Sequence, residues 1–324
     1  LASMRQMDKI MKSTKFSKGK KSTTTVLDVK KDVYQTITDR IIALIEDGVN
    51  PWRKTWKVEN GSFAGAKNFI SGKPYRGINH FILSCTAFNC PYFLTMKQVN
   101  DKGGRVLQGE KATPILFAKS YLYKDSKEVD GQVTEEDKKG FCYKIYHVFN
   151  LEQTTLEIPV VETVEDDKNA KIQICESIYS GYKNAPKLLH GGASAYYSPT
   201  NDIVKMPVMS CFDNSEAYYA TLFHELIHST GHARRLEREG IVNFDRFDSQ
   251  RYSSEELVAE MGASFLNALC GTSSPDLERN TAAYVKGWLV KLKSDNKFIF
   301  RAAAQAQKAV VFIIGEDEGE EENS

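Results

Sequence analysis

The stretch TLFHELIHSTGH, residues 221–232, contains two histidines four positions apart and a glutamate directly after the first. Residues four apart share one face of an α-helix, so His224 and His228 can direct two imidazole nitrogens at the same metal ion. Glu225 can then serve as a general base, because a zinc ion lowers the pKa of its water to about 7. The motif therefore predicts a helical zinc site with catalytic capacity.

A catalytic zinc site needs a third protein ligand and one open position. His232 continues the spacing of four, but Gly231 is expected to end the helix and to turn this side chain away. The longer pattern H-E-x-x-H-x-x-G-x-x-H would need a histidine at the position of Arg234. The third ligand should therefore come from another element.

The acidic stretch SSEELVAEMGASFL offers that ligand. Ser253 or Ser254 can cap a helix on which Glu256 and Glu260 share one face. Carboxylates among apolar neighbours need a cationic partner, and a metal ion is such a partner. We predict Glu256 as the ligand and Glu260 as the acceptor that orients a histidine ring. The alternative is a surface helix whose acidic residues, Glu255 included, face water.

The apolar periodicity predicts the elements that must position these residues. It predicts helices at 33–45 and 171–182, strands at 114–123 and 141–153 with an exposed connection at 129–140, and a β-hairpin at 195–207. Three more helices are expected around residues 223, 262 and 285, and a last one runs to Gly315.

An acidic stretch that contains Pro159 divides these elements into two groups and reads as a linker. We therefore expect an α+β protein of two domains. The predicted organisation is a disordered basic tail (1–27), a first domain (28–155), a linker (156–168), a second domain (169–314) and a solvated acidic tail (315–324).

The formal net charge of +1 hides an asymmetry. Residues 1–155 contain 26 Lys and Arg against 16 Asp and Glu, or +10, and the remainder contains 17 against 26, or −9. A basic front half suggests a polyanionic partner such as nucleic acid. The alternative is a solvated tail, because residues 1–31 alone contribute +7.

Several classes of protein are disfavoured. No apolar run approaches the roughly 20 residues of a membrane-spanning helix, so no membrane partner is expected. The six cysteines are scattered without a C-x-x-C pair, which suggests reduced thiols and a cytoplasmic location. The stretch GRVLQGEK nearly spells a phosphate-binding loop, but Glu110 stands at the lysine position and Ala112 follows Lys111. We expect no nucleotide cofactor.

Longer stretches of the chain resemble a known family. GGASAYYSPTNDIVKMP, YYATLFHELIHSTGH and SSEELVAEMGASFL resemble the zincin-type metallopeptidase domain of the ArdC antirestriction family, which is carried by conjugative plasmids and other mobile elements. YQTITDRIIALIEDGVNPWRKTW, SGKPYRGIN, KQVNDKGGRVLQGEKATPILF and YHVFNLEQT resemble its N-terminal domain, and similar domains open some plasmid conjugation primases. The resemblance covers roughly residues 28–300 and assigns the family's metal motifs to His224, Glu225, His228, Glu256 and Glu260.

The resemblance implies an α/β front domain that binds single-stranded DNA, a zincin-like second domain that holds a metal, and a role in shielding incoming DNA from restriction. A single-strand binder needs cations for phosphates and exposed rings for bases. The candidates are Trp52, Arg53, Lys54, Lys73, Tyr75, Arg76, Asn79, Lys97, Arg105 and Lys111. The alternative for the rings is burial in the core, which makes the basic residues the stronger candidates.

Three functions remain open from the sequence. The first is a DNA-binding antirestriction protein whose metal need not be hydrolytic. The second is a DNA-associated metalloprotease with Glu225 as general base, for which AYYSPTNDIV would offer an edge strand to a protein substrate. The third is an accessory module in plasmid replication or conjugation. Zinc (Zn²⁺) is the expected cofactor, with manganese (Mn²⁺) or another divalent metal as the alternative.

Overall fold

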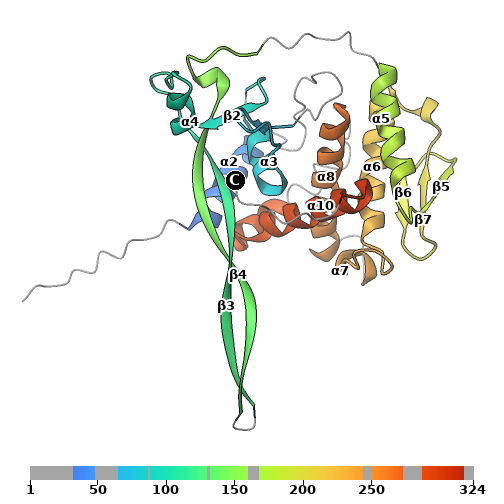
Figure 1. The fold of residues 1–324 in the computed structure, drawn as a ribbon. Coiled ribbons are helices and arrows are strands. Elements are labelled where there is room, and N and C mark those ends of the chain that lie inside the picture. The colour runs from blue at the N-terminus through green and yellow to red at the C-terminus, as the bar shows by residue number, and fades with distance from the viewer. Residues whose placement is uncertain are drawn as a thin grey trace, which may run out of the picture. The chain divides into compact units, whose positions relative to one another are not determined.

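The computed structural model describes residues 32–47, 65–86, 88–129, 132–159, 168–243, 250–272 and 287–316 (Figure 1). The elements below all belong to the unit Val33–Ser324. The predicted basic tail and most of the predicted acidic tail lie outside the described residues. Along the described chain, no helix combines the length and the apolar character that a membrane crossing requires.

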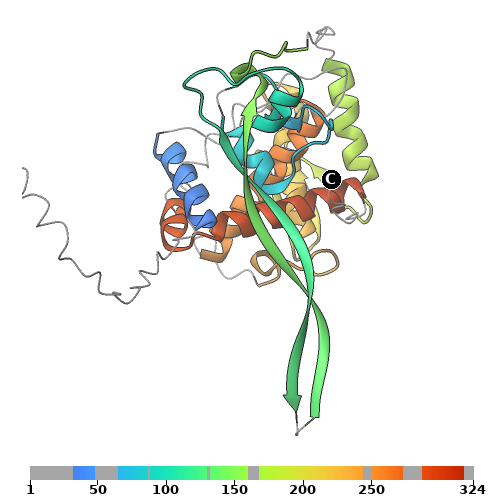
Figure 2. The same cartoon turned by 60° about the vertical axis from the view of Figure 1, so that its left-hand side comes forward.

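The front domain is built on a four-stranded sheet with the order β1-β2-β4-β3. Its strands are β1 (Lys67–Asn68), β2 (Tyr92–Thr95), β3 (Thr113–Val129) and β4 (Gln132–Asn150). β1 runs parallel to β2, and the other neighbours are antiparallel. Figures 1 and 2 show β3 and β4 as a long twisted ribbon.

The predicted connection at 129–140 is wrong, because strand pairing continues to Val129 opposite Gln132. Polar composition indicates exposure to water, and a two-stranded ribbon can keep its backbone hydrogen bonds without an apolar face. The strand predicted at 114–123 is therefore only the inner part of β3. The one predicted at 141–153 coincides with β4 only as far as Asn150, because residues 151–153 form a 3-10 turn.

Three helices accompany this sheet: α2 (Val33–Glu46), α3 (Gly77–Ser84) and α4 (Met96–Asp101). The predicted helix at 33–45 is confirmed, whereas α3 and α4 are not among the predicted elements. α4 begins with a capping box, in which Thr95 and Gln98 bond each other's backbone N–H groups. A short 3-10 turn, η1 (Leu151–Gln153), follows β4.

The second domain combines helices with a small sheet. Its elements are α5 (Lys168–Gly181), β5 (Lys187–His190), β6 (Tyr196–Ser198), β7 (Ile203–Met206), η2 (Met209–Cys211), α6 (Ser215–Thr230), α7 (Glu239–Val242), α8 (Gln250–Cys270), helical residues 287–294 and α10 (Phe298–Ile314). The sheet order is β5-β7-β6, so that β6 is an edge strand.

These elements agree with most of the predicted pattern. The hairpin predicted at 195–207 corresponds to β6 and β7, and the predicted helices correspond to α5, α6, α8 and α10. A further helix is expected around residue 285. The described residues of this region begin at 287, and residues 287–294 are helical.

One apolar core is shared by helices from both domains. It contains Ile41 of α2, Phe81 of α3, Leu226 of α6 and Ile299 of α10. α10 packs against α3, α5, α6 and α8. The chain is thus a two-domain α+β protein whose domains share a core, and the predicted limits at 155 and 169 stay a prediction.

Candidate metal centre

Helix α6 carries the two motif histidines on one face. The helix begins after Asn214, whose side chain accepts a hydrogen bond from the N–H of Ala217 at 2.7 Å. It ends at Thr230, so that His224 and His228 lie within its last two turns. Their Nε2 atoms are 3.1 Å apart and face the same space.

Helix α8 brings a carboxylate to these two nitrogens. Glu256 is 4% exposed, and its Oε2 lies 3.4 Å from Nε2 of His224. Its Oε1 lies 3.3 Å from Nε2 of His228. One ligand atom from each of the three residues lies within 4.8 Å of the other two. The fold therefore brings the three predicted ligands together.

The start of α8 differs from the prediction. The sequence predicts Ser253 or Ser254 as the cap of this helix, but α8 begins at Gln250. The sequence DSQRY before them has no apolar periodicity that would indicate the extra turn. The register of the carboxylates is nevertheless the expected one, because it depends only on their spacing within the helix.

The charges of this cluster fit a divalent cation. Burial alone would lower the pKa of His228, but the carboxylates of Glu256, Glu255 and Glu225 raise it to about 10. Burial alone would raise the pKa of Glu256, but His228 and His224 hold it below the ordinary value. A carboxylate this deeply buried is stable only beside positive charge, which protonated imidazoles or a metal ion can supply. Two imidazoles and one carboxylate are also a donor set that zinc accepts.

Each imidazole ring also lies near a second carboxylate through its Nδ1 atom, and the predicted orienting role of Glu260 stays a prediction. Nδ1 of His224 is 3.8 Å from Oε1 of Glu260, the predicted acceptor, which is the distance of a loose ion pair. Nδ1 of His228 is 3.3 Å from Oε1 of Glu255. Glu255 is 3% exposed, so the alternative that it faces water is wrong.

Glycine permits the close approach of the elements around this cluster. A Cβ on Gly262 of α8 would lie 2.6 Å from Cδ1 of Ile227 in α6. A Cβ on Gly231, where α6 ends as predicted, would lie 2.6 Å from Cγ1 of Ile241. Both helices can therefore come close enough for the carboxylate to reach the imidazoles.

Two further motif residues take positions consistent with the sequence. Glu225 is buried within α6. His232 stands beyond the helix end, where its Nδ1 accepts a hydrogen bond from the N–H of Arg234 at 3.2 Å. In the described parts of the chain, the candidate metal cluster of three residues does not include it.

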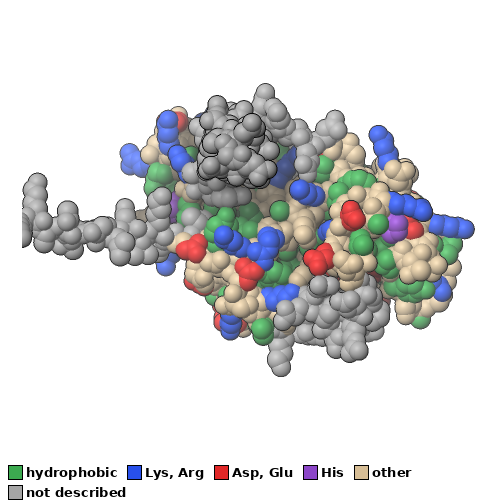
Figure 3. Space-filling view, turned by 90° about the horizontal axis from the view of Figure 1, so that it is seen from below, with side chains coloured by type: hydrophobic (Ala, Val, Ile, Leu, Met, Phe, Trp, Pro, Cys, Tyr) green, Lys and Arg blue, Asp and Glu red, His purple; other side chains and the backbone are tan. Residues whose placement is uncertain are grey.

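The candidate DNA contacts in the front domain form a less uniform group. Five cationic side chains are exposed: Lys73, Arg76, Lys97, Arg105 and Lys111. Arg76 forms an ion pair with Glu316 at 3.1 Å. Trp52, Arg53 and Lys54 lie outside the described residues. On the face in Figure 3, Lys and Arg side chains are interspersed with Asp and Glu.

Tyr75 and Asn79 are engaged within the fold. Tyr75 packs against the apolar cluster that contains Phe93, and burial raises the pKa of its hydroxyl. The amide of Asn79 accepts from the N–H of Leu116 at 2.8 Å and donates to its carbonyl oxygen at 2.6 Å. This side chain therefore bonds both backbone polar groups of Leu116 at the outer edge of β3, as a neighbouring strand would.

Comparisons with known proteins agree with this division. Residues 182–305 match a family model described as zincin-like metallopeptidase. Residues 31–149 match the N-terminal domain of anti-restriction factor ArdC. The protein y4eC of Sinorhizobium fredii (strain NBRC 101917 / NGR234) is 32% identical over 289 residues, which cover 86% of this chain and 90% of that protein. DNA primase TraC of Escherichia coli is 32% identical over 302 residues, which are 89% of this chain but only 27% of the primase.

Two solved structures are also similar. The metal-free structure of antirestriction ArdC protein from R388 plasmid is 35% identical, with a TM-score of 0.66 and coverage of 87% of this chain and 96% of that one. The Mn(II)-bound structure is 33% identical, with a TM-score of 0.64 and coverage of 87% and 97%. The second domain is thus of the zincin-like metallopeptidase class. The chain as a whole belongs to the ArdC family of antirestriction proteins.

Proposed function

We propose that this chain is an antirestriction protein that binds single-stranded DNA with its front domain and a divalent cation with its second domain. The observation that carries the proposal is the buried convergence of His224, His228 and Glu256 on one space. Buried groups of this kind are costly unless a cation joins them, and a stable fold has little other reason to bring them together.

The ligand set suits Zn²⁺, whereas the solved ArdC protein from R388 plasmid has a Mn(II)-bound structure. For this chain, either ion is a proposal. A bound divalent ion would supply Lewis acidity, which polarises a carbonyl group and lowers the pKa of water. The three side chains would hold it, and their burial would keep competing water away.

The DNA-binding part of the proposal rests on charge. The five candidate cations of the front domain lie at the surface, where they can approach phosphates. All five lie within 39 positions of one another, from Lys73 to Lys111. Because the contact would be with the backbone, we expect binding that ignores base sequence and weakens steeply with salt.

Peptide hydrolysis is the second candidate, and two observations favour it. Glu225 is buried next to a ligand in the sequence, where it could accept a proton from an attacking water and deliver it to a leaving amine. The edge strand β6 packs against α6, so an extended peptide that pairs with β6 would run beside the histidines. Tyr196 of this strand is 44% exposed.

Metal analysis of the purified full-length chain tests the first proposal. We expect close to one divalent ion per chain in the wild type and none in a His228→Ala variant. An unloaded wild type that stays empty after dialysis against Zn²⁺ and Mn²⁺ would refute the metal site.

A transfer assay separates the two candidate functions. Plasmid DNA is introduced into a restricting host that expresses either the wild type or Glu225→Gln. If the variant protects the DNA as well as the wild type, hydrolysis is dispensable for antirestriction. Loss of protection, together with retained metal and retained DNA affinity, would favour the hydrolytic candidate.

A further inference from the structure

Two of the arginines that follow α6, Arg235 and Arg238, each link the end of this helix to a carboxylate. Arg235 donates to Asp202 at 2.8 Å and to the carbonyl oxygen of Ser229 at 2.9 Å. Arg238 donates to Glu255 at 2.6 Å and to the carbonyl oxygen of Ile227 at 2.7 Å. The two pairs are similar in chemistry, but only one of them touches a candidate metal ligand.

The Arg238 pair is buried and multiply bonded. The side chains of Arg238 and Glu255 are 6% and 2% exposed. Nε of Arg238 donates to Oε2 of Glu255 at 3.0 Å, so the guanidinium grips both carboxylate oxygens. The same guanidinium donates to Oγ1 of Thr230. The carboxylate of Glu255 is therefore fixed in place by a planar, permanently charged partner.

This fixed carboxylate reaches the ring of His228. Its Oε1 lies 3.3 Å from Nδ1 of His228, while Nε2 of the same ring faces Glu256 and His224. A hydrogen bond from Nδ1–H to Glu255 would leave the lone pair of Nε2 directed at the metal space. We propose that Glu255, locked by Arg238, is a positioning residue that fixes the tautomer and angle of His228 for metal binding. The inference rests on the proposed metal site.

The orientation of the two imidazole rings should then be held to different degrees. Nδ1 of His224 has its carboxylate, Glu260, at 3.8 Å, which is longer than the 3.3 Å at His228. We expect His228 to be the pre-organised ligand and His224 to be the one that adjusts when the ion binds.

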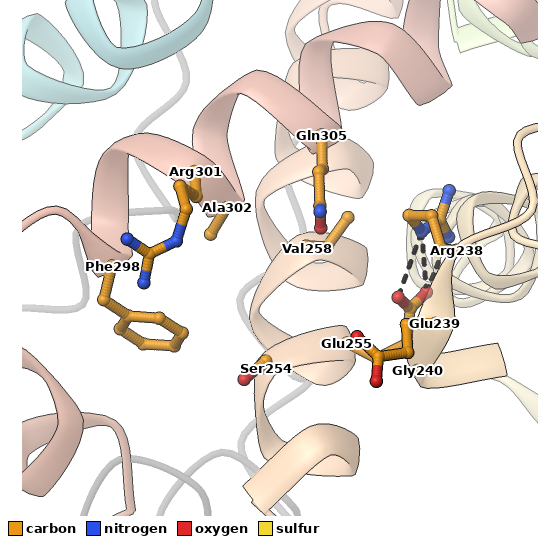
Figure 4. A pocket seen from close by; sticks show the side chains of 10 residues that line it. All are labelled: Arg238, Glu239, Gly240, Ser254, Glu255, Val258, Phe298, Arg301, Ala302 and Gln305. Atoms are coloured by element: carbon orange, nitrogen blue, oxygen red, sulfur yellow. Dashed lines mark hydrogen bonds and ion pairs between the residues drawn. The ribbon is translucent and has the colours of Figure 1, made fainter. Parts of the chain in front are cut away.

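The pocket around this pair shows which variants can keep the fold. Arg238 and Glu255 line a pocket of about 240 Å³ between α7, α8 and α10, together with Ser254, Arg301 and Gln305 (Figure 4). A side chain shortened at position 255 would open into space that already exists, and water could solvate Arg238 there. Glu255→Ala is therefore expected to fold.

The experiment measures metal affinity in the full-length chain. The dissociation constant of Zn²⁺ is determined by competition with a chromogenic chelator for the wild type, Glu255→Ala and Glu255→Gln. Absorption of the Co²⁺-substituted protein reports the ligand geometry, and thermal unfolding of the metal-free protein reports the fold. Asp202→Asn is the matched control, because it weakens the other arginine–carboxylate pair at the same helix end.

The expected results follow from what each variant keeps. Glu255→Ala should weaken Zn²⁺ binding about 10- to 100-fold and change the Co²⁺ spectrum, because His228 loses its orientation. Glu255→Gln retains an acceptor oxygen and should keep affinity within about fivefold of the wild type. Asp202→Asn should lower the unfolding temperature of the metal-free protein but leave its Zn²⁺ affinity within about twofold.

Three outcomes would overturn the inference or its basis. Unchanged affinity in Glu255→Ala would overturn the positioning role alone. An equal loss of affinity in Asp202→Asn would also overturn it, because the effect would then come from general destabilisation. A wild type that binds neither Zn²⁺ nor Co²⁺ would instead refute the proposed metal site.

Discussion

The carboxylates at the candidate metal centre of the second domain are buried, whereas the candidate DNA-binding cations of the front domain are exposed. Glu255 and Glu256 are 3% and 4% exposed, and each lies within 3.4 Å of an imidazole nitrogen. Lys97, Arg105 and Lys111 of the front domain lie at the surface. Charged side chains thus act in two different dielectric surroundings within one chain.

The difference determines how each group can act. A buried charge interacts strongly with one partner at one distance, so the loss of a single residue changes the chemistry of the site. An exposed charge is screened by water and salt, so single residues contribute little and the number of cations matters most. The substitutions below are expected to show this contrast.

Removal of a ligand should have the largest effect. Glu256→Ala is expected to weaken Zn²⁺ or Mn²⁺ binding by on the order of 1,000-fold, about 4 kcal/mol, which exceeds the effect of changing an outer partner. The wild type should gain thermal stability on addition of the ion, because binding to the folded state alone shifts the unfolding equilibrium. The variant should not. Differential scanning fluorimetry with and without a chelator measures both.

A metal-dependent rise in the unfolding temperature that persists in Glu256→Ala would show that the ion binds elsewhere. Ala at an exposed acid of the same domain, Glu237, is the matched control and should leave the rise unchanged.

The junction between the domains should respond to pH. His80 of α3 is 3% exposed and packs edge-to-face on Phe265 of α8, with 5.0 Å between the ring centroids. Burial lowers its pKa from 6.5 to about 4. Between pH 6.5 and 4, the histidine is therefore protonated in the unfolded chain but neutral in the folded chain. The contribution of neutral His80 to the free energy of unfolding is fully present above pH 6.5 and falls by about 3 kcal/mol as the pH drops to 4.

Denaturant unfolding at several pH values measures this dependence. His80→Gln removes the titration but keeps a polar side chain, so its free energy of unfolding should fall less steeply between pH 6.5 and 4. Carboxylates titrate in both proteins, and the difference between the two curves isolates the histidine. Parallel curves would contradict the assignment.

The candidate metal centre was largely predictable from the sequence because metal chemistry constrains it. Two histidines at helical spacing demand a third ligand. His232 is expected to lie beyond the helix end, and Arg234 stands where the longer motif needs a histidine, so the acidic stretch that contains Glu256 is the next candidate. The role of Glu255 was not predictable in this way. Its partner Arg238 comes from the irregular segment after α6, where no periodicity indicates which way a side chain points.

The front domain was less predictable, for two physical reasons. The β3–β4 ribbon continues through polar sequence, because exposed strands need backbone pairing but no apolar face. Asn79 looked like a polar group available for DNA, but it bonds the backbone of Leu116. A sequence shows that a side chain is polar without showing which partner it has found.

An intermediate effect is expected where the metal-site helices approach each other. Gly262→Ala would place a methyl group 2.6 Å from Cδ1 of Ile227, on the helix that carries both histidines. Overpacking typically costs about 1–3 kcal/mol, and alanine regains up to about 1 kcal/mol through its helix propensity. We expect a net loss of about 1 kcal/mol in the free energy of unfolding, together with weaker metal binding.

Gly287→Ala is the matched control, because among the described residues its Cβ would meet only Oγ of Ser253, at 3.3 Å. Addition of Ile227→Val to Gly262→Ala removes the nearest clashing atom and should restore part of the stability. Full stability in Gly262→Ala would mean that the two helices can separate at no cost.

The smallest effect per residue is expected in the front domain. Replacement of Lys73, Lys97 and Lys111 by Gln should weaken binding of a single-stranded oligonucleotide about tenfold at low salt, or about twofold for each lysine. If each contacts one phosphate, the slope of log affinity against log salt should become shallower by about 2, because each contact on a single strand contributes about 0.7. Fluorescence anisotropy over a salt series measures both quantities.

A triple variant of exposed lysines in the second domain provides the control: Lys183, Lys187 and Lys308 changed to Gln. It removes the same net charge, so a purely non-local attraction would weaken binding equally in both proteins. We expect the control to keep the wild-type slope, since a change in slope requires the loss of phosphate contacts. If both triple variants gave the same slope of log affinity against log salt, the assignment of DNA binding to the front domain would be refuted, even if the metal site behaves as proposed.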